Sequence, residues 1–288
     1  MPALIDLRRR IKSVKNTQQI TQAMKTVSTA KFKKSQRIVL ESRPYWHGLP
    51  ELLSEIIFWV DRESHPLLEE RAERKIEGVV IASDKGLCGA FNSNLLEKAL
   101  LFFEEKAHYS QVNLVLIGKR AVNFFKKFSF PVDFVYSEQV QKLTQEDLEK
   151  IAQFLMRLYA FGKTDAVYVA YNEFKSILSP KVTITRFLPL KPPEREEGQE
   201  GLPLDWEPGA DTVLNVVLPL YVKDQIRHFF HESSAAEHAA RMMAMDNATK
   251  NAEDLIGDLT LVLNKIRQAS ITKELLEIMT AVEALGEK

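Results

Sequence analysis

The C-terminal part of this chain decides its fold, and residues 248–269 read ATKNAEDLIGDLTLVLNKIRQA. Apolar side chains recur there in steps of four and three residues, at Ala248, Ala252, Leu255, Leu259, Val262, Ile266 and Ala269. Such spacing keeps one seam of an α-helix turned toward a partner helix and is typical of a coiled coil. Between about Thr212 and Leu285 only Pro219 and Gly257 interrupt the pattern, so we expect one long C-terminal helix.

The N-terminal end has a similar pattern. From Leu4 to about Val60 the only glycine is Gly48 and the only prolines are Pro44 and Pro50. Three-four spacing links a set of apolar residues: Leu4, Leu7, Ile11, Val14, Ile20, Met24 and Val27. This predicts a second long helix, bent or broken near Arg43-Pro44. Helices of this length extend well beyond a small domain, so we expect the two to pair as an antiparallel coiled coil.

The middle of the chain has a different texture. Short runs rich in β-branched residues, at 79–81, 112–117, 132–136 and 166–171, alternate with helical stretches near 92–107, 118–128 and 144–161. This alternation predicts an α/β domain with a parallel sheet of Rossmann type, and a last strand at 182–188 is expected as an antiparallel edge. Residues 192–211 hold seven acids, one base and several Pro and Gly, which indicates an exposed loop. We therefore expect four parts: an N-terminal helix at 1–70, a Rossmann-like α/β domain at 71–191, a loop at 192–211 and a C-terminal helix at 212–288.

Composition excludes several classes of protein. The 288 residues carry 39 basic and 39 acidic side chains, without a run of about 18 apolar residues that would predict a membrane span. One cysteine, Cys88, cannot form an intramolecular disulfide. Charge is nevertheless segregated, because residues 7–40 contain ten bases and no acid. A nucleic acid, an organelle-targeting segment, a plain solvated helix and an acidic protein partner all remain possible explanations, although Phe32 is the only aromatic residue available there for base stacking.

Few residues suggest chemistry. The turn from Ser83 to Gly89 follows a predicted strand and contains Lys85, as a phosphate loop would, yet neither GxGxxG nor GxxxxGK[ST] is present. For Cys88, a buried thiol and a reactive thiol are about equally expected. A second group on the C-terminal helix, His228, His231, Glu232 and His238, lacks metal-ligand spacing. No pair of carboxylates stands isolated in an apolar segment, so we expect no catalytic residue, no metal and no cofactor.

The two ends resemble a known family. Residues 11–24, IKSVKNTQQITQAM, closely resemble the N-terminal helix of the γ subunit of F-type ATP synthases, and residues 240–245, ARMMAM, and 264–275, NKIRQASITKEL, resemble its C-terminal helix. The family also carries a SDKGLCG turn, found here at residues 83–89, in a Rossmann-like domain between the two helices. The resemblance covers the whole chain in segment order. One departure is Ala281-Val282, where the family pattern has Gly-Ala.

The resemblance implies a function. The family's γ subunit is the central stalk, or rotor, which couples proton-driven rotation of the membrane c ring to ATP synthesis or hydrolysis at the α/β catalytic hexamer. It implies a non-catalytic subunit without cofactor, present in one copy per three α and three β subunits, which also contacts the ε subunit and the c-subunit ring and binds no nucleic acid. It further implies a peripheral membrane protein on the cytoplasmic face of a bacterial plasma membrane, with the mitochondrial matrix or chloroplast stroma as the alternative.

The resemblance also assigns contacts to particular residues. Met24 and Lys25 match the position that faces an acidic helix-turn-helix of β, and Arg267 with Gln268 match a pair that hydrogen-bonds a β loop. Arg241 lies in the matching Ala-Arg-Met segment. Trp206 and Glu207 resemble part of the family's foot, which contacts the c ring and ε. Residues 212–222 are rich in Val and Leu and look like a strand, but match helix in the family. The alternatives are a nucleotide-binding α/β enzyme that uses the turn at 83–89 and a basic coiled-coil nucleic-acid binder.

Overall fold

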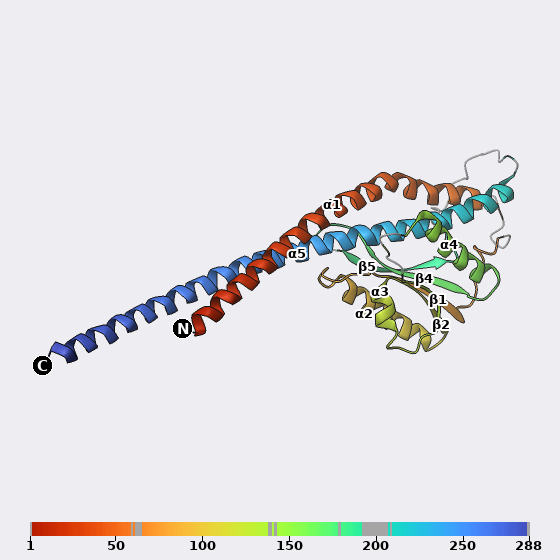
Figure 1. Cartoon of the computed structure of the whole chain (residues 1–288). Helices are drawn as coiled ribbons and strands as arrows, with labels where there is room; N and C mark the ends of the chain where they lie inside the picture. The colour runs from red at the N-terminus through yellow and green to blue at the C-terminus, as the bar shows by residue number, and fades with distance from the viewer. Residues whose placement is uncertain are drawn as a thin grey trace, which may run out of the picture. The chain divides into compact units, whose positions relative to one another are not determined.

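Two long helices form the ends of the chain. The computed structural model describes residues 2–58, 60, 65–137, 140, 143–177, 180–191, 207 and 209–286. Helix α1 (Pro2–Phe58) precedes the strands in the sequence, and helix α5 (Ala210–Gly286) follows them (Figure 1). Residues 212–222 are helical, as the resemblance implies. Of the bend or break expected near Arg43-Pro44, the break is wrong, because α1 continues through Pro44 and Pro50. Leu40 and Pro44 are both exposed, so water can bond the carbonyl that loses its donor at Pro44.

The middle of the chain forms one five-stranded sheet. Its strands are β1 (Lys75–Ile81), β2 (Gln111–Ile117), β3 (Val132–Tyr136), β4 (Ala166–Glu173) and β5 (Lys181–Leu188), in the order β3-β2-β1-β4-β5. The first four pair in parallel and β5 pairs antiparallel with β4. Each strand and the antiparallel edge are confirmed, and the order 3-2-1-4 is that of a Rossmann fold.

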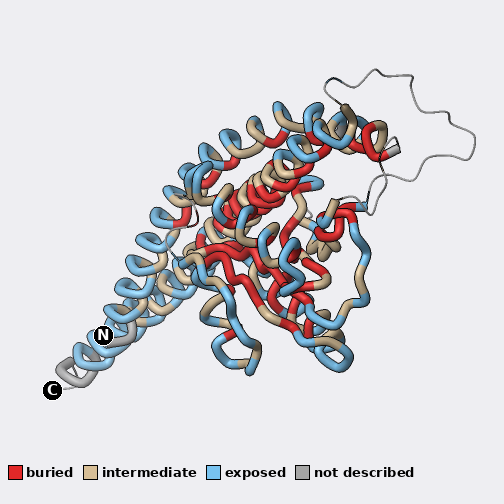
Figure 2. Tube along the Cα trace, turned by 90° about the vertical axis from the view of Figure 1, so that its right-hand side faces the viewer, coloured by how far each residue is buried: buried red, intermediate tan, exposed pale blue. Residues whose placement is uncertain are grey.

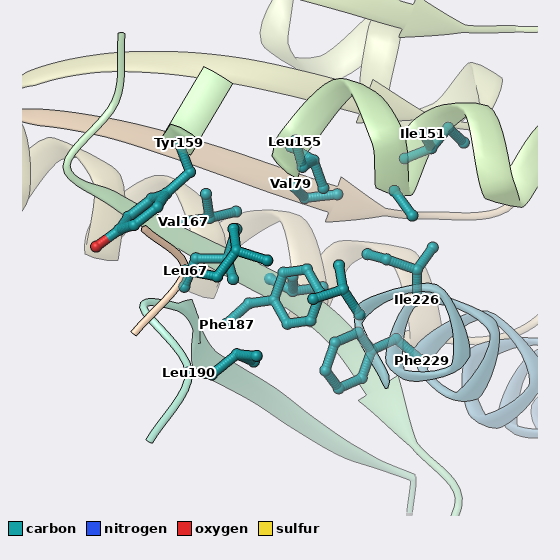
Figure 3. Packing of buried hydrophobic residues seen from close by; sticks show 14 of the residues in the cluster. Leu67, Val79, Ile151, Leu155, Tyr159, Val167, Phe187, Leu190, Ile226 and Phe229 are labelled. Atoms are coloured by element: carbon teal, nitrogen blue, oxygen red, sulfur yellow. The ribbon is translucent and has the colours of Figure 1, made fainter. Parts of the chain in front are cut away.

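Helices cover both faces of the sheet. Alternation along β1 sends Ile76 and Val80 to one face, where they pack with α2 (Phe91–Ala107) and α3 (Lys119–Phe125). Val79 and Ile81 belong to the other face, covered by α4 (Gln145–Ala160) and the first part of α5. Figure 3 shows this second core, which includes Ile151 and Leu155 of α4, Ile226 and Phe229 of α5, and Phe187 of β5. The two cores explain why residues 79–82, at the end of β1, form a continuous apolar run.

The chain divides into two compact units. One comprises Thr29–Arg241 and therefore contains the sheet, α2 to α4 and the adjoining parts of α1 and α5. The other comprises Met1–Ser28 with Met242–Lys288, which are the outer parts of the same two helices. Buried residues concentrate in the first unit, whereas most of the outer helical residues are exposed (Figure 2). Below, the first is called the sheet unit and the second the helical unit.

Within the helical unit, α1 and α5 lie side by side in antiparallel orientation. The Lys25 ammonium lies 2.7 Å from a carboxylate oxygen of Asp246, and the Thr249 hydroxyl donates to the Thr21 hydroxyl at 2.8 Å. These contacts join residues near the end of one segment to residues near the start of the other. The expected antiparallel pair is therefore confirmed.

The seam of this pair differs partly from the expected one. On α1 the less exposed positions continue from Val14 through polar residues, at Gln18, Thr21, Lys25 and Ser28. The expected members Ile20 and Val27 are 60% and 56% exposed. On α5 the seam lies one residue later than expected at three steps, at Ile256, Leu263 and Ser270 in place of Leu255, Val262 and Ala269. Apolarity was the only guide to the seam, whereas polar side chains occupy part of it, and two of them, Thr21 and Lys25, bond across it to Thr249 and Asp246.

Candidate functional site

The Ser83–Gly89 turn occupies the position where a Rossmann fold binds its ligand. It follows β1, whose neighbours β2 and β4 lie on opposite sides, so the strand order reverses at this point. In open α/β sheets, ligands bind at the carboxyl ends of the strands beside such a reversal. The turn therefore occupies the position where this fold would bind a ligand.

Side chains from α2 hold the turn in shape. The backbone N–H of Ser83 donates to Asn92 Oδ1 at 3.2 Å, and Asn92 Nδ2 donates to the Cys88 sulfur at 3.2 Å. The Ser83 hydroxyl donates to the carbonyl of Lys85 at 2.7 Å. Leu87 has a φ of 61° and is 61% exposed, so the turn presents a large apolar side chain from a left-handed backbone conformation. Gly89 follows it with a φ of 58°.

Helix α5 covers the other side of the turn. The Arg241 guanidinium donates from Nε to the carbonyl of Gly86 and from Nη2 to the carbonyl of Lys85, both at 3.3 Å. It also forms an ion pair with Glu237 at 2.7 Å, and both side chains are buried. One helical turn before Glu237, the Ser233 hydroxyl donates to the carbonyl of Ile81 at 3.5 Å. Helix α5 is thus bonded to three backbone carbonyls at and beside the turn, those of Ile81, Lys85 and Gly86.

Little space remains between the strand ends and α5. A cavity of about 10 Å³ lies there, lined by Ile81, Ala82, Val140, Phe230, Ser233, Ser234 and Glu237. That volume accommodates about one water molecule, whereas small-molecule sites occupy roughly 300–1,000 Å³. This cavity is therefore far too small for a nucleotide, which argues against the nucleotide-binding alternative.

The contacts and burial of Cys88 and of the α5 histidines indicate structural roles for these residues. Cys88 is buried, and burial raises the pKa of its thiol, which disfavours the reactive thiolate. The His228 ring packs edge-on against Trp46, with ring centroids 4.1 Å apart. Burial, with smaller contributions from Arg241 and Lys31, lowers the pKa of His238 to about 4, so its ring is neutral at pH 7. Among the described residues no group of three or more His, Cys, Asp or Glu side chains is arranged to hold a metal ion.

One buried acid was missed by the sequence reasoning. Glu77 lies buried in β1 among apolar neighbours, and burial, followed by Asp133 of β3, raises its pKa, so a carboxyl with a raised pKa is present that the sequence patterns did not reveal. The two residues are 56 positions apart and only the sheet brings them together. Alternation was the available signal, since Glu77 stands where a β-strand inward position repeats with Val79 and Ile81.

The residues assigned to partner contacts differ in their exposure and in their contacts. Met24 is half-buried, Lys25 pairs with Asp246, and Arg267 and Gln268 are exposed on α5. Arg241 is 7% exposed, with its hydrogen bonds directed to the turn. Glu207 is exposed, whereas Trp206 lies outside the described residues, as does most of the expected loop at 192–211.

The outermost part of α5 carries an apolar surface. From residue 271 to residue 282 every position is exposed, and six of them are large and apolar: Ile271, Leu275, Leu276, Ile278, Met279 and Val282. An isolated helix exposing so much apolar area is a typical site of protein–protein contact. None of the described helices is both long enough and apolar enough to cross a membrane.

Comparisons with known proteins agree with this architecture. A family model described as ATP synthase matches residues 3–285. The ATP synthase gamma chain of Pelotomaculum thermopropionicum is 42% identical over 285 residues, covering 99% of this chain and 100% of the relative. The gamma chain of Solibacter usitatus is 45% identical over 291 residues, covering 99% of both chains.

Solved structures share the fold at lower identity. A chain of the Euglena gracilis mitochondrial ATP synthase, solved by cryo-EM with OSCP, F1 and the c-ring, covers 100% of this chain and 96% of its own at a TM-score of 0.70 and 18% identity. A chain of the Tetrahymena thermophila mitochondrial central stalk and c-ring covers 80% and 99% at a TM-score of 0.58 and 24% identity. By sequence over its full length and by fold, the chain belongs to the ATP synthase gamma chain family.

Proposed function

We propose that this chain is the central shaft of a rotary ATP synthase and has no catalytic site of its own. It couples rotation of the membrane c ring, driven by proton flow, to synthesis or hydrolysis of ATP in the α/β hexamer. The observation that carries this proposal is the closed crevice at the Ser83–Gly89 turn, where Arg241 binds the carbonyls of Lys85 and Gly86. A Rossmann fold whose ligand position is filled by its own helix serves as a scaffold.

The antiparallel helices are suited to transmit torque. Each helix contributes a seam residue about every three or four positions, so twisting or bending the pair disturbs contacts along its whole length. Opposite faces of the pair differ, because the α1 segment from 7 to 28 carries six bases and no acid. An asymmetric shaft presents a different face to each β subunit as it turns, and thereby changes the relative stability of their open and closed states.

Partner contacts follow from exposure and charge. Arg267 and Gln268 are exposed side by side on α5 and are assigned to a β loop. Met24 and Lys25 are assigned to an acidic segment of β; Lys25 keeps 37% of its side chain exposed beside Asp246 and so still contributes positive charge to that surface. Arg241, also assigned to a partner contact, is 7% exposed and instead contributes by holding the Ser83–Gly89 turn in shape.

The remaining assignments concern the assembly. The proposed parts are an N-terminal shaft helix at 1–70, a Rossmann-like domain at 71–191, a foot loop at 192–211 and a C-terminal shaft helix at 212–288. Trp206 and Glu207 in the foot contact the c ring and ε. One copy serves three α and three β subunits, and the chain is peripheral to the cytoplasmic face of a bacterial plasma membrane.

Substitution of the exposed pair on α5 tests the shaft assignment. Arg267→Ala and Gln268→Ala, each assembled with α and β subunits, are expected to lower ATPase turnover severalfold because each removes hydrogen bonds to β during rotation. Lys265→Ala is the matched control, since Lys265 is an exposed base two residues away without an assigned contact. Circular dichroism should show unchanged helix content in all three variants. Wild-type turnover in both Arg267→Ala and Gln268→Ala would contradict the assigned contact.

A further inference from the structure

Strand β3 is attached to the sheet by a short backbone ladder. It has five residues, lies at the edge of the sheet, and pairs with β2 at four positions. The register shifts within that pairing, between Leu114 and Val115. Val132 and Val135 are both exposed. Backbone pairing alone therefore holds β3 less firmly than the central strands, which are bonded on both edges.

Three polar side chains cross the sheet beside this ladder. They are Glu77 of β1, Asn113 of β2 and Asp133 of β3, and Glu77 and Asn113 stand at paired positions. Asn113 Nδ2 donates to Asp133 Oδ2 at 2.9 Å, and Asp133 in turn raises the pKa of Glu77 through its charge and a hydrogen bond. Glu77 is 2% exposed, and its Oε1 atom is buried without a hydrogen-bond partner. Asp133 is exposed, so water solvates its charge.

Two ionised carboxylates cannot hydrogen-bond each other, because each is only an acceptor. Glu77 is the member that keeps the proton, because it is buried, its Oε1 atom has no hydrogen-bond partner, and a buried carboxylate without a cation is costly. We propose that Glu77 and Asp133 form a buried proton-binding site, in which the neutral Glu77 carboxyl donates to the Asp133 carboxylate and, with Asn113, ties edge strand β3 to β1 across β2.

The surroundings of Glu77 leave Asp133 as its ionisable partner. Its paired positions are Asn113 on β2 and Val167 on β4, neither of which titrates. From α4, which covers this face, the Tyr159 hydroxyl donates to the carbonyl of Glu69. Burial, followed by the charge and hydrogen bond of Asp133, raises the pKa of Glu77 to about 8. In the described part of the chain no cation offsets that shift.

The proton makes attachment of β3 dependent on pH. An opening that exposes Glu77 to water returns its pKa to the ordinary value of 4.5. Between pH 4.5 and about 8 the closed sheet thus binds one proton more than the open form. Attachment is strongest at low pH in this window, weakens by up to tenfold for each pH unit, and becomes independent of pH above about 8, where both forms are deprotonated.

Hydrogen exchange on the full-length chain tests this site. Exchange of the Val132–Tyr136 amides, corrected for intrinsic rates, should give an opening constant that rises by up to tenfold per pH unit between pH 5 and 8 and is then constant. In Glu77→Gln, a neutral side chain of the same shape, the opening constant should not change over this range. Difference infrared spectra at pH 6.5 should show the carbonyl stretch of a protonated carboxylic acid in the wild type that Glu77→Gln lacks.

A second variant protects the test against failure of Glu77→Gln to fold. Asp133→Asn alters an exposed position and removes the carboxylate that disfavours ionisation of Glu77, so the pH at which opening becomes constant should move below that of the wild type. An identical pH profile in the wild type and Glu77→Gln, an unmoved profile in Asp133→Asn, or the absence of the protonated carboxyl band would each overturn the proposal.

Discussion

The two parts of helix α5 are both helical, but side chains of the first part are buried in a core and most side chains of the second are exposed. In the sheet unit, residues 210–241 bury Leu214, Leu218, Val222, Ile226 and Phe229 against strands and α4. In the helical unit, residues 242–286 contribute a sparse seam against α1, and beyond Ser270 every described side chain is exposed. The first part is stabilised by apolar burial, while the second depends on helix propensity and on whatever protein surrounds it. The same substitution should therefore change the free energy of unfolding by different amounts in the two parts.

The largest expected difference concerns one pair of leucines. Leu218→Ala removes a side chain that is 0% exposed, and should lower the free energy of unfolding by about 2–5 kcal/mol through lost burial and a cavity. Leu275→Ala makes the same change at a side chain that is 56% exposed, and should cost less than about 0.5 kcal/mol in the isolated chain. Urea unfolding followed by circular dichroism measures both. Equal losses would contradict the contrast between the two parts of α5.

Arg241 sharpens the comparison at the point where the first part ends. Arg241→Ala leaves Glu237 buried without its cation and frees the carbonyls of Lys85 and Gly86, so the sheet unit should lose about 3 kcal/mol of stability. Arg241→Lys retains the charge but cannot reach all three acceptors, so its stability should lie between those of the wild type and Arg241→Ala. Arg267→Ala, at an exposed arginine of the second part, should leave unfolding unchanged. An Arg241→Ala variant as stable as the wild type would show that the turn does not need this contact.

The smallest expected effect lies in the polar seam. Hydrogen bonds from Lys25 and Lys250 lower the pKa of Asp246, so its contribution is present above the ordinary value of 3.8 and is lost as pH falls through the lower value in the folded pair. Asp246→Asn should loosen residues 15–28 and 242–255 at pH 7 but have no effect at pH 2. High salt should reduce the difference, because the pair is partly exposed. Site-specific hydrogen exchange in these segments is the measurement, and a pH-independent difference would contradict the ion-pair account.

Much of the fold could be predicted because its signals are local. The β-branched runs and the helical stretches between them predict the strands and helices of the sheet unit, and four-three spacing predicts two long helices. The seam could be predicted only in part, since its members Thr21 and Ser28 are polar and Ile20 and Val27 are apolar but exposed. The sequence left open whether α1 is bent or broken near Pro44, because solvent access to the freed carbonyl is a property of the folded helix.

The candidate site was harder to predict than the fold. The Ser83–Gly89 turn was identified from its place between a strand and a helix, but its closure depends on Arg241, 152 residues beyond Gly89. Nothing local distinguishes an arginine that binds a partner from one that binds its own chain. Glu77 and Asp133 were missed for the same reason, since only the strand order β3-β2-β1 brings their carboxyls together.

Native mass spectrometry of the chain co-expressed with α and β subunits tests the central claim most directly. A single shaft that presents different faces to three β subunits predicts one copy of this chain with three α and three β subunits. Truncation after Ser270 removes the exposed apolar end of α5 and should weaken this complex while the sheet unit stays folded. A complex containing one copy of the chain per three α and three β is the result that the account predicts; no complex, or several copies per hexamer, would contradict it.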